Sequence, residues 1–241
     1  MWALGLSVGP HVPLILRGPE TAASVDSRRD LGLPDVFERL VEDLYAEDPL
    51  LGPALAQAMA LRAASAPANQ AEPGTSASRR LGGSVGRLLA APDGPHAAVL
   101  EINGWDTHTG QSGALKRQLA GLADTVLGLR EVIGSRWSDT AGVVITEFGR
   151  RVALNGTGGS DHGAGGVAFV FGGAIRGGAV VADWPGLAPG DLLDGRDLRP
   201  TRDLRSVAKA LCITHLGLDP EEVDRVVFPG SRAVPPCAGL L

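Results

Sequence analysis

The chain has 241 residues, of which 44% are hydrophobic and 20% are charged, and its formal net charge at pH 7 is −5. A chain of this length can bury one sizeable core, so we expect a single domain over residues 1–241. The acidic balance and the lack of a dense basic face argue against a nucleic-acid partner. No apolar stretch in the sequence is long enough to cross a bilayer, so no membrane partner is expected.

The first third of the chain predicts helices separated by a loop. Apolar residues recur at helical spacing over residues 34–47, where Pro34 suits the first turn, and again over residues 49–63. Alanine, serine, proline, glycine and glutamine dominate residues 64–80, which we expect to form a flexible loop. Residues 84–91 then predict a short helix.

The middle of the chain carries the clearest pattern. Residues 97–102 and 141–146 are apolar runs typical of buried strands, and one apolar stripe over residues 112–134 predicts a long helix between them. A strand, a helix and a second strand in this order predict a βαβ unit, in which both strands run parallel with a right-handed crossover. Such sheets bind ligands just beyond the carboxyl ends of their strands.

The last third predicts a third strand over residues 167–171 and a loop rich in glycine and proline over residues 184–200. Thr201 or Asp203 can cap a helix that runs to about His215. The sequence therefore predicts an α/β fold with a regular C-terminal helix.

Two loops bounded by glycine each place a carboxylate close to an imidazole. Asp106 and His108 follow the first strand of the predicted βαβ unit, and Asp161 and His162 precede Gly163. Carboxylate oxygens and imidazole nitrogens bind zinc, manganese and iron, so these four side chains are candidate ligands of a divalent metal ion. The alternatives are that Asp106 caps the following helix while His108 faces solvent, and that Asp161 shapes a turn.

Two further residues are candidates for a catalytic role. Glu147 follows the second strand of the βαβ unit, where it can bind metal or act as a general base, and the alternative is an ion pair with Arg150 or Arg151. Arg150 can hold a small anionic substrate through its guanidinium fork, and the alternative is a solvated surface charge.

Taken in order, several motifs resemble those of the DUF1501 family, a bacterial family of unknown function related to the alkaline phosphatase and sulfatase superfamily. The resemblance covers residues 97–218 and is carried by Asn103-Gly104-Trp105-Asp106-Thr107-His108, Ile145-Thr146-Glu147-Phe148-Gly149-Arg150, Asp161-His162-Gly163, Phe171-Gly172-Gly173-Ala174-Ile175-Arg176-Gly177-Gly178 and Gly195-Arg196-Asp197-Leu198 with Thr201-Arg202-Asp203-Leu204-Arg205.

The resemblance implies a three-layer α/β/α sandwich of the alkaline phosphatase type, with a mostly parallel sheet and metals at the strand ends. In the superfamily, an Asp-His pair followed by glycine binds one metal of a two-metal site, and this role carries over to Asp161 and His162. The resemblance also implies metal binding by Asp106 and His108, although their spacing departs from the superfamily's usual acid and histidine pair.

The chain departs from the superfamily pattern at its beginning. Proteins of the superfamily begin with a strand that ends in a metal-binding acid, followed by a Ser, Thr or modified Cys nucleophile. No strand ending in a glycine-rich acidic loop is expected before residue 34, which predicts an N-terminally truncated form. The sequence carries no signal peptide or twin-arginine signal, although the family is often exported, so the expected localisation is open between export and the cytoplasm.

Two functions are therefore expected. The first is a metal-dependent hydrolase of phosphate or sulfate esters, in which a divalent ion activates a nucleophile and stabilises the oxyanion. The second is a non-catalytic remnant or binding module that lacks the N-terminal metal ligand and the nucleophile.

Overall fold

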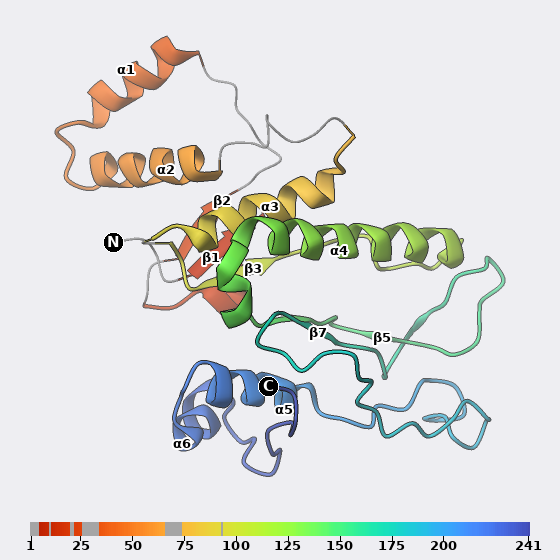
Figure 1. The fold of residues 1–241 in the computed structure, drawn as a ribbon. Helices are drawn as coiled ribbons and strands as arrows, with labels where there is room; N and C mark the ends of the chain where they lie inside the picture. Colours follow the sequence, from red (N-terminus) through yellow and green to blue (C-terminus); the bar gives the residue numbers. More distant parts are fainter. Residues whose placement is uncertain (1–4, 10, 20–21, 26–33, 66–73, 93) are drawn as a thin grey trace. The chain divides into compact units, whose positions relative to one another are not determined.

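A computed structural model describes residues 5–9, 11–19, 22–25, 34–65, 74–92 and 94–241 (Figure 1). Within these residues the chain is mixed α/β, and it divides into two compact units. The first unit takes its described residues from Met1–Asn103 and Arg117–Gly134, and the second comprises Gly104–Lys116 and Ser135–Leu241. The prediction of one domain over the whole chain stays a prediction.

The first unit contains a small parallel sheet. Its strands β1 (Gly5–Val8), β2 (Ala22–Val25) and β3 (Ala97–Leu100) lie in the order β2-β1-β3. As the middle strand, β1 is hydrogen-bonded on both sides, and Leu6 and Val8 are buried. Two strands thus precede residue 34, whereas the sequence analysis expected none that ends in a glycine-rich acidic loop. Residues 26–33, which follow β2, lie outside the described residues.

Helices make up most of the rest of the first unit. They are the 3₁₀ turn Leu14–Leu16, α1 (Asp35–Tyr45), α2 (Leu51–Ser65), α3 (Ala77–Ala90) and the larger part of α4 (Gln111–Ile133). The predictions of helices over residues 34–47, 49–63 and 112–134 are confirmed. The predicted loop over residues 64–80 is wrong at both ends, because α2 extends to Ser65 and α3 already begins at Ala77. Ser76 caps α3 by accepting from the Arg79 amide at 3.1 Å. Residues 66–73 of that loop lie outside the described residues.

Helices α3 and α4 lie side by side at a distance that only glycine permits (Figure 1). A Cβ atom built on Gly82 would lie 1.9 Å from the Thr125 carbonyl oxygen, and one built on Gly128 would lie 2.1 Å from the carbonyl oxygen of Arg79. Four aliphatic side chains of the two helices are buried, and they are Val85, Leu88, Leu129 and Ile133. No helix among the described residues combines the length and the apolar character that crossing a bilayer requires.

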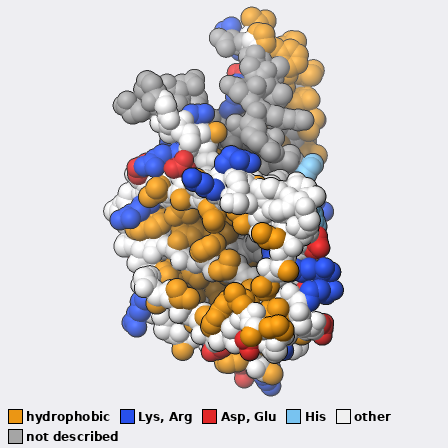
Figure 2. Space-filling model, turned by 90° about the vertical axis from the view of Figure 1, so that its right-hand side faces the viewer, with side chains coloured by type: hydrophobic (Ala, Val, Ile, Leu, Met, Phe, Trp, Pro, Cys, Tyr) orange, Lys and Arg blue, Asp and Glu red, His pale blue; other side chains and the backbone are white. Residues whose placement is uncertain are grey.

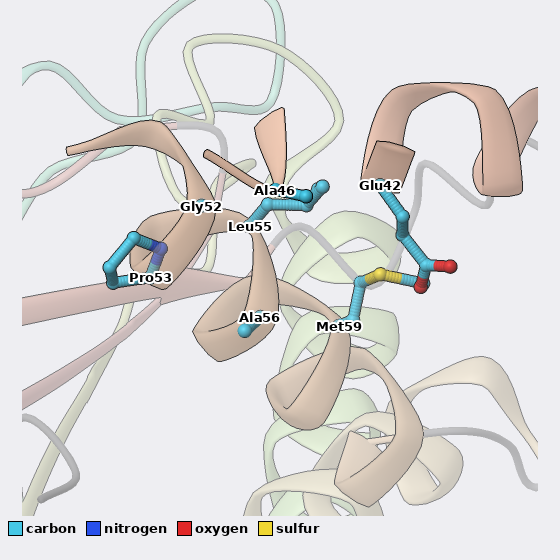
Figure 3. A pocket seen from close by; sticks show the side chains of 7 residues that line it. All are labelled: Glu42, Ala46, Gly52, Pro53, Leu55, Ala56 and Met59. Carbon is cyan, nitrogen blue, oxygen red and sulfur yellow. The ribbon is translucent and has the colours of Figure 1, made fainter. Parts of the chain in front are cut away.

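Helices α1 and α2 leave apolar side chains in contact with solvent. Val36, Leu40 and Leu44 on α1 are each more than half exposed, and Figure 2 shows hydrophobic side chains at the molecular surface. An open pocket of about 370 Å³ lies between α1 and α2, where the side chains of Glu42 and Met59 point toward one another (Figure 3). None of the residues that line this pocket is a predicted site residue.

The second unit has strands of only two or three residues. After the 3₁₀ segment Gly134–Asp139, β4 (Gly142–Val144) pairs with β7 (Phe169–Phe171), and β5 (Gly149–Arg150) pairs with β6 (His162–Gly163). Both pairs are antiparallel.

The prediction that residues 97–102 and 141–146 form the two parallel strands of one βαβ unit is therefore wrong among the described strands. β3 pairs with β1, and β4 pairs with β7 in a separate sheet. A physical reason lies at Gly142, where a Cβ atom would meet the Phe171 ring at 2.2 Å, so this glycine admits the aromatic side chain of the antiparallel partner. The three-layer sandwich with a mostly parallel sheet stays a prediction, and the structure shows a mixed α/β chain with a small three-stranded parallel sheet.

The C-terminal region of the second unit is helical. It contains α5 (Leu204–Ala210), the π-helical segment Leu211–His215, α6 (Pro220–Glu222) and the π-helical segment Val223–Val227. The predicted helix ending near His215 is confirmed, and Asp203 caps it by accepting from the Arg205 amide at 2.9 Å. A small buried cluster holds this region together, formed by Val207, Ala210, Cys237 and Leu240.

Candidate metal centre

Two segments far apart in sequence lie against each other in the second unit. The loop that contains Asp106 and His108 meets residues 155–160, since Thr109 forms a β-bridge with Gly158 and the Ser160 amide donates to the Thr107 carbonyl at 3.2 Å. The next residues continue into β6, which pairs with β5. The backbone alone therefore brings both predicted metal-binding motifs to one place.

Asp106, His108 and His162 form a compact group of possible metal ligands. One carboxylate oxygen of Asp106 lies 2.8 Å from His162 Nε2 and 3.1 Å from His108 Nε2. The three potential ligand atoms all lie within 4.8 Å of one another, and each side chain is about half exposed. The structure thus unites three of the four residues that the sequence predicted as ligands.

The donor set and its spacing fit a divalent metal ion. Metal–ligand bonds of about 2.1 Å in tetrahedral geometry separate neighbouring ligand atoms by roughly 3.4 Å. The two spacings around Asp106, 2.8 Å and 3.1 Å, are a few tenths of an ångström shorter. One carboxylate and two imidazoles form a set found at zinc sites and at iron sites with open coordination positions. The arrangement can therefore hold an ion and still leave positions for a substrate.

Asp161 lies behind His108 and outside the three-residue group. Its Oδ1 is 3.3 Å from His108 Nδ1, the ring nitrogen on the other side from the one that faces Asp106. Asn155 Nδ2 lies 3.4 Å from the same oxygen, and Arg151 lies 3.4 Å from Oδ2. A carboxylate bonded to the second ring nitrogen of a ligand histidine fixes the orientation of the ring in many metal sites.

Both carboxyl groups of this cluster favour the ionised form. The hydrogen bond with His162 is the largest cause that lowers the pKa of Asp106, and electrostatic interactions with His108, His162 and Arg150 add to it. The hydrogen bonds from Asn155 and then from His108 lower the pKa of Asp161. Both side chains are therefore available as anions at neutral pH.

Arg150 connects the two loops. Its guanidinium donates to the backbone carbonyls of Trp105 and Ser160, and one of its nitrogens lies 3.4 Å from Asp106 Oδ1. About a quarter of this side chain is exposed. The guanidinium group therefore holds together the two loops that carry the ligands. The role in substrate binding that the sequence suggested for Arg150 stays a prediction.

Phe148 supports His162 from the side of β5. Its ring stacks on the imidazole with a centroid separation of 4.2 Å and an interplanar angle of 14°, and the Arg150 guanidinium lies 5.0 Å from the Phe148 centroid. The exposed Glu147 lies outside the three-residue group. Arg150 and Arg151, its alternative ion-pair partners, pair instead with Asp106 and Asp161.

Several residues that build this site were not predicted from the sequence. Asn155 Nδ2 donates to the His108 backbone carbonyl at 2.9 Å, and Asn155 Oδ1 accepts from the amides of Thr157 and Gly159 at 3.0 Å each. An asparagine at the start of a glycine-rich segment is a turn former, which was the available signal. The roles of Phe148 and Gln111 left no such local signal. His162 lies 14 residues after Phe148, and Gln111 connects the nearby Thr107 to the distant Ser160.

Comparison with known proteins identifies a family. The family model described as "Protein of unknown function (DUF1501)" matches residues 34–226, which include every residue of the candidate metal centre. No curated protein and no solved structure matches the chain.

Proposed function

We propose that this chain, which belongs to the DUF1501 family, binds a divalent metal ion through Asp106, His108 and His162 and hydrolyses a phosphate or sulfate ester there. The observation that carries the proposal is the convergence of three ligand atoms, within 4.8 Å, from two segments that are more than 50 residues apart. The resemblance of the motifs to the alkaline phosphatase superfamily supports an ester as substrate, and with it a fold of that type.

The side chains around the group have separate tasks in this proposal. A divalent ion supplies Lewis-acid chemistry to an ester oxygen and to a nucleophile when it is bound. Asp161 fixes the His108 ring through Nδ1, Phe148 fixes the His162 ring by stacking, and Arg150 holds both loops. The three ligands are therefore oriented before any ion arrives, which lowers the cost of binding it.

The neighbouring hydroxyl groups support water as the nucleophile. Thr107 is 5% exposed and Ser160 is 1% exposed, and both hydroxyls donate to the side chain of Gln111. A hydroxyl that is buried and engaged in this way cannot reach an ester. The half-exposed ligands leave room for a water molecule to attack phosphorus or sulfur while the ester oxygen departs.

Metal titration tests the binding part of the proposal. The purified protein is treated with a chelator, dialysed and titrated with Zn²⁺ and Mn²⁺ in a calorimeter. We expect saturable binding, weakened roughly 100-fold or more by Asp106→Asn or His162→Ala, since even the loss of a group behind a ligand costs 10- to 100-fold. His96→Ala is the control because His96 is exposed and belongs to the first unit. A wild-type protein that gains no ion contradicts the proposal.

The same observation on the hydroxyl groups favours a second candidate function, a module that binds a metal and an anion without turnover. Hydrolysis of p-nitrophenyl phosphate and p-nitrophenyl sulfate, with and without added metal, separates the two. Metal-dependent release of p-nitrophenol that disappears in His162→Ala supports the hydrolase. Metal binding with no release from either ester supports the module.

A further inference from the structure

We infer that Gln111 is a positioning residue of the metal centre, which ties the loop of Asp106 and His108 to the loop of Asp161 and His162. This role depends on the metal site proposed above. Gln111 is the first residue of α4 and lies in the second unit together with both loops. It is not among the three possible ligands.

The side-chain oxygen of Gln111 accepts two hydrogen bonds, one from each loop. Thr107 Oγ1 donates to Gln111 Oε1 at 3.0 Å, and Ser160 Oγ donates to the same oxygen at 2.5 Å. Thr107 lies between Asp106 and His108 in the sequence, and Ser160 directly precedes Asp161. A single acceptor atom therefore joins Thr107, which lies between two ligands, to Ser160, which lies two residues before the third ligand, His162.

The chemistry of the amide suits this task. A carbonyl oxygen has two lone pairs, so it can accept from two hydroxyls at once while staying uncharged. The backbone of Gln111 adds a third connection, because its amide donates to the Gly158 carbonyl at 2.9 Å. Both hydroxyl groups are buried, so breaking either bond would leave a polar group without a partner and away from water.

The exposure of the ligands explains why such a bridge matters for metal binding. Asp106, His108 and His162 are each about half exposed, so packing restricts these side chains weakly. The distance between the ligand atoms then depends on how firmly the two backbones are held together. Loss of the two hydrogen bonds to Gln111 should let the distance between the ligand atoms vary more. It should therefore weaken metal binding more than it lowers the stability of the fold.

The test compares two substitutions of Gln111 in the full chain. Gln111→Leu removes the acceptor at similar size, and Gln111→Glu keeps an oxygen that can accept from both hydroxyls. We expect Gln111→Leu to weaken Mn²⁺ binding roughly 10- to 100-fold, and Gln111→Glu to restore most of the affinity. The melting temperature of each metal-free variant is measured alongside. Gln57→Leu, on α2 in the first unit, is the matched control and should bind Mn²⁺ as the wild type does.

The outcomes separate this inference from the proposed function. If the wild-type protein binds no Mn²⁺ or Zn²⁺, the proposed function fails and the role of Gln111 fails with it. If the wild type binds and Gln111→Leu binds equally tightly, the role of Gln111 is refuted while the metal site stands. If Gln111→Glu is as weak as Gln111→Leu, the two accepted hydrogen bonds do not explain the effect, and the inference is overturned.

Two milder variants keep the inference testable if Gln111→Leu does not fold. Thr107→Val and Ser160→Ala each remove one of the two hydroxyl donors, and each should weaken Mn²⁺ binding. Thr109→Val is the control for the first of them, since Thr109 is an exposed threonine of the same loop. Unchanged binding in both variants would overturn the inference.

Discussion

The two compact units keep their structure by different means. Among the described residues, the buried side chains of the first unit are mostly aliphatic, and two glycines let α3 and α4 approach closely. The second unit buries a lysine, an aspartate and several hydroxyl groups beside a small apolar cluster. Its strands have two or three residues each. In the second unit, hydrogen bonds from side chains therefore hold together segments that regular secondary structure holds together in the first unit.

This difference shows where a site can be built. Apolar packing is nondirectional, so it holds helices together without fixing a side chain to a fraction of an ångström. A network of satisfied buried polar groups fixes directions as well as distances, and it is costly to disturb. The candidate metal centre lies in the unit that depends on such networks. Four predictions test the contrast, from the largest expected effect to the smallest.

Lys209→Met should have the largest effect, because it removes the central cation of the second unit. Lys209 is 1% exposed, and its ammonium donates to Asp224 and to the carbonyls of Ser231 and Val234. Removal leaves the Asp224 carboxylate and the Val234 carbonyl without the ammonium, while the Ser231 carbonyl still accepts from the Val234 amide. The loss should cost about 3–5 kcal/mol of unfolding free energy. Denaturation in urea, followed by circular dichroism, measures the loss.

The chain offers a matched control in its only other lysine, Lys116, which is exposed. Lys116→Met should leave the unfolding free energy nearly unchanged. An equally small effect of Lys209→Met would show that the buried ammonium does not hold the C-terminal region.

Gly128→Ala tests the first unit, where α3 and α4 are held together by close packing of their backbones. The added Cβ atom would lie 2.1 Å from the Arg79 carbonyl oxygen, so α3 and α4 must move apart. Overpacking of this kind should cost about 3 kcal/mol, measured as a shift of the urea midpoint. Gly121→Ala on the same helix is the control, since its Cβ would meet the side chain of Ser78 at 3.1 Å and no backbone atom of α3 within 4 Å. Equal destabilisation by both substitutions would speak against tight packing at Gly128.

Arg150→Lys should destabilise the second unit although the charge is kept. A single ammonium cannot reach the carbonyls of Trp105 and Ser160 with the geometry of the guanidinium fork. The loss of charged hydrogen bonds to buried carbonyls should cost about 1.5–3 kcal/mol in unfolding free energy. Arg117→Lys, at an exposed position of α4, should change little, and a similar loss there would point to a general effect of the substitution.

Asp203 should give the smallest effect, and it depends on pH. Hydrogen bonds from the Arg205 side chain and amide lower the pKa of this carboxyl from 3.8 to about 2. Because the pKa in the folded state is the lower one, the contribution of Asp203 to stability is present above about pH 4 and is lost as the pH falls toward 2. Asp203→Ala should cost about 1 kcal/mol at pH 7, where the helix cap is lost. Asp203→Asn keeps an acceptor and should flatten stability between pH 4 and pH 2, and a pH profile identical to the wild type would contradict this assignment.

The elements that could be predicted are those whose sequence pattern lies within the element itself. The apolar repeats of α1, α2 and α4 extend over many residues, so their helices could be recognised. β5 and β6 have two residues each and exist only because they pair with one another across the chain. No local pattern contains that pairing, and the same is true of the antiparallel partner of β4.

The site was predicted in its residue types and only partly in its arrangement. Asp106, His108 and His162 were recognised because carboxylates and imidazoles in glycine-bounded loops are typical of metal ligands. The sequence treated Asp161 in the same way, while the structure places it behind His108. Gln111 is a common residue type at the start of a helix, and nothing in the sequence around it predicts a role in the site. Its role follows from two accepted hydrogen bonds, one from each loop.

The burial of Lys209 also determines how the chain reacts with amine-directed reagents. The chain contains two lysines, and the ammonium of Lys209 is enclosed with three oxygen acceptors. In the folded protein, an activated ester should therefore acylate the side chain of Lys116 and spare that of Lys209. A single fluorophore or cross-linker can then be placed on the side chain of Lys116, at the point where α4 passes from one unit into the other.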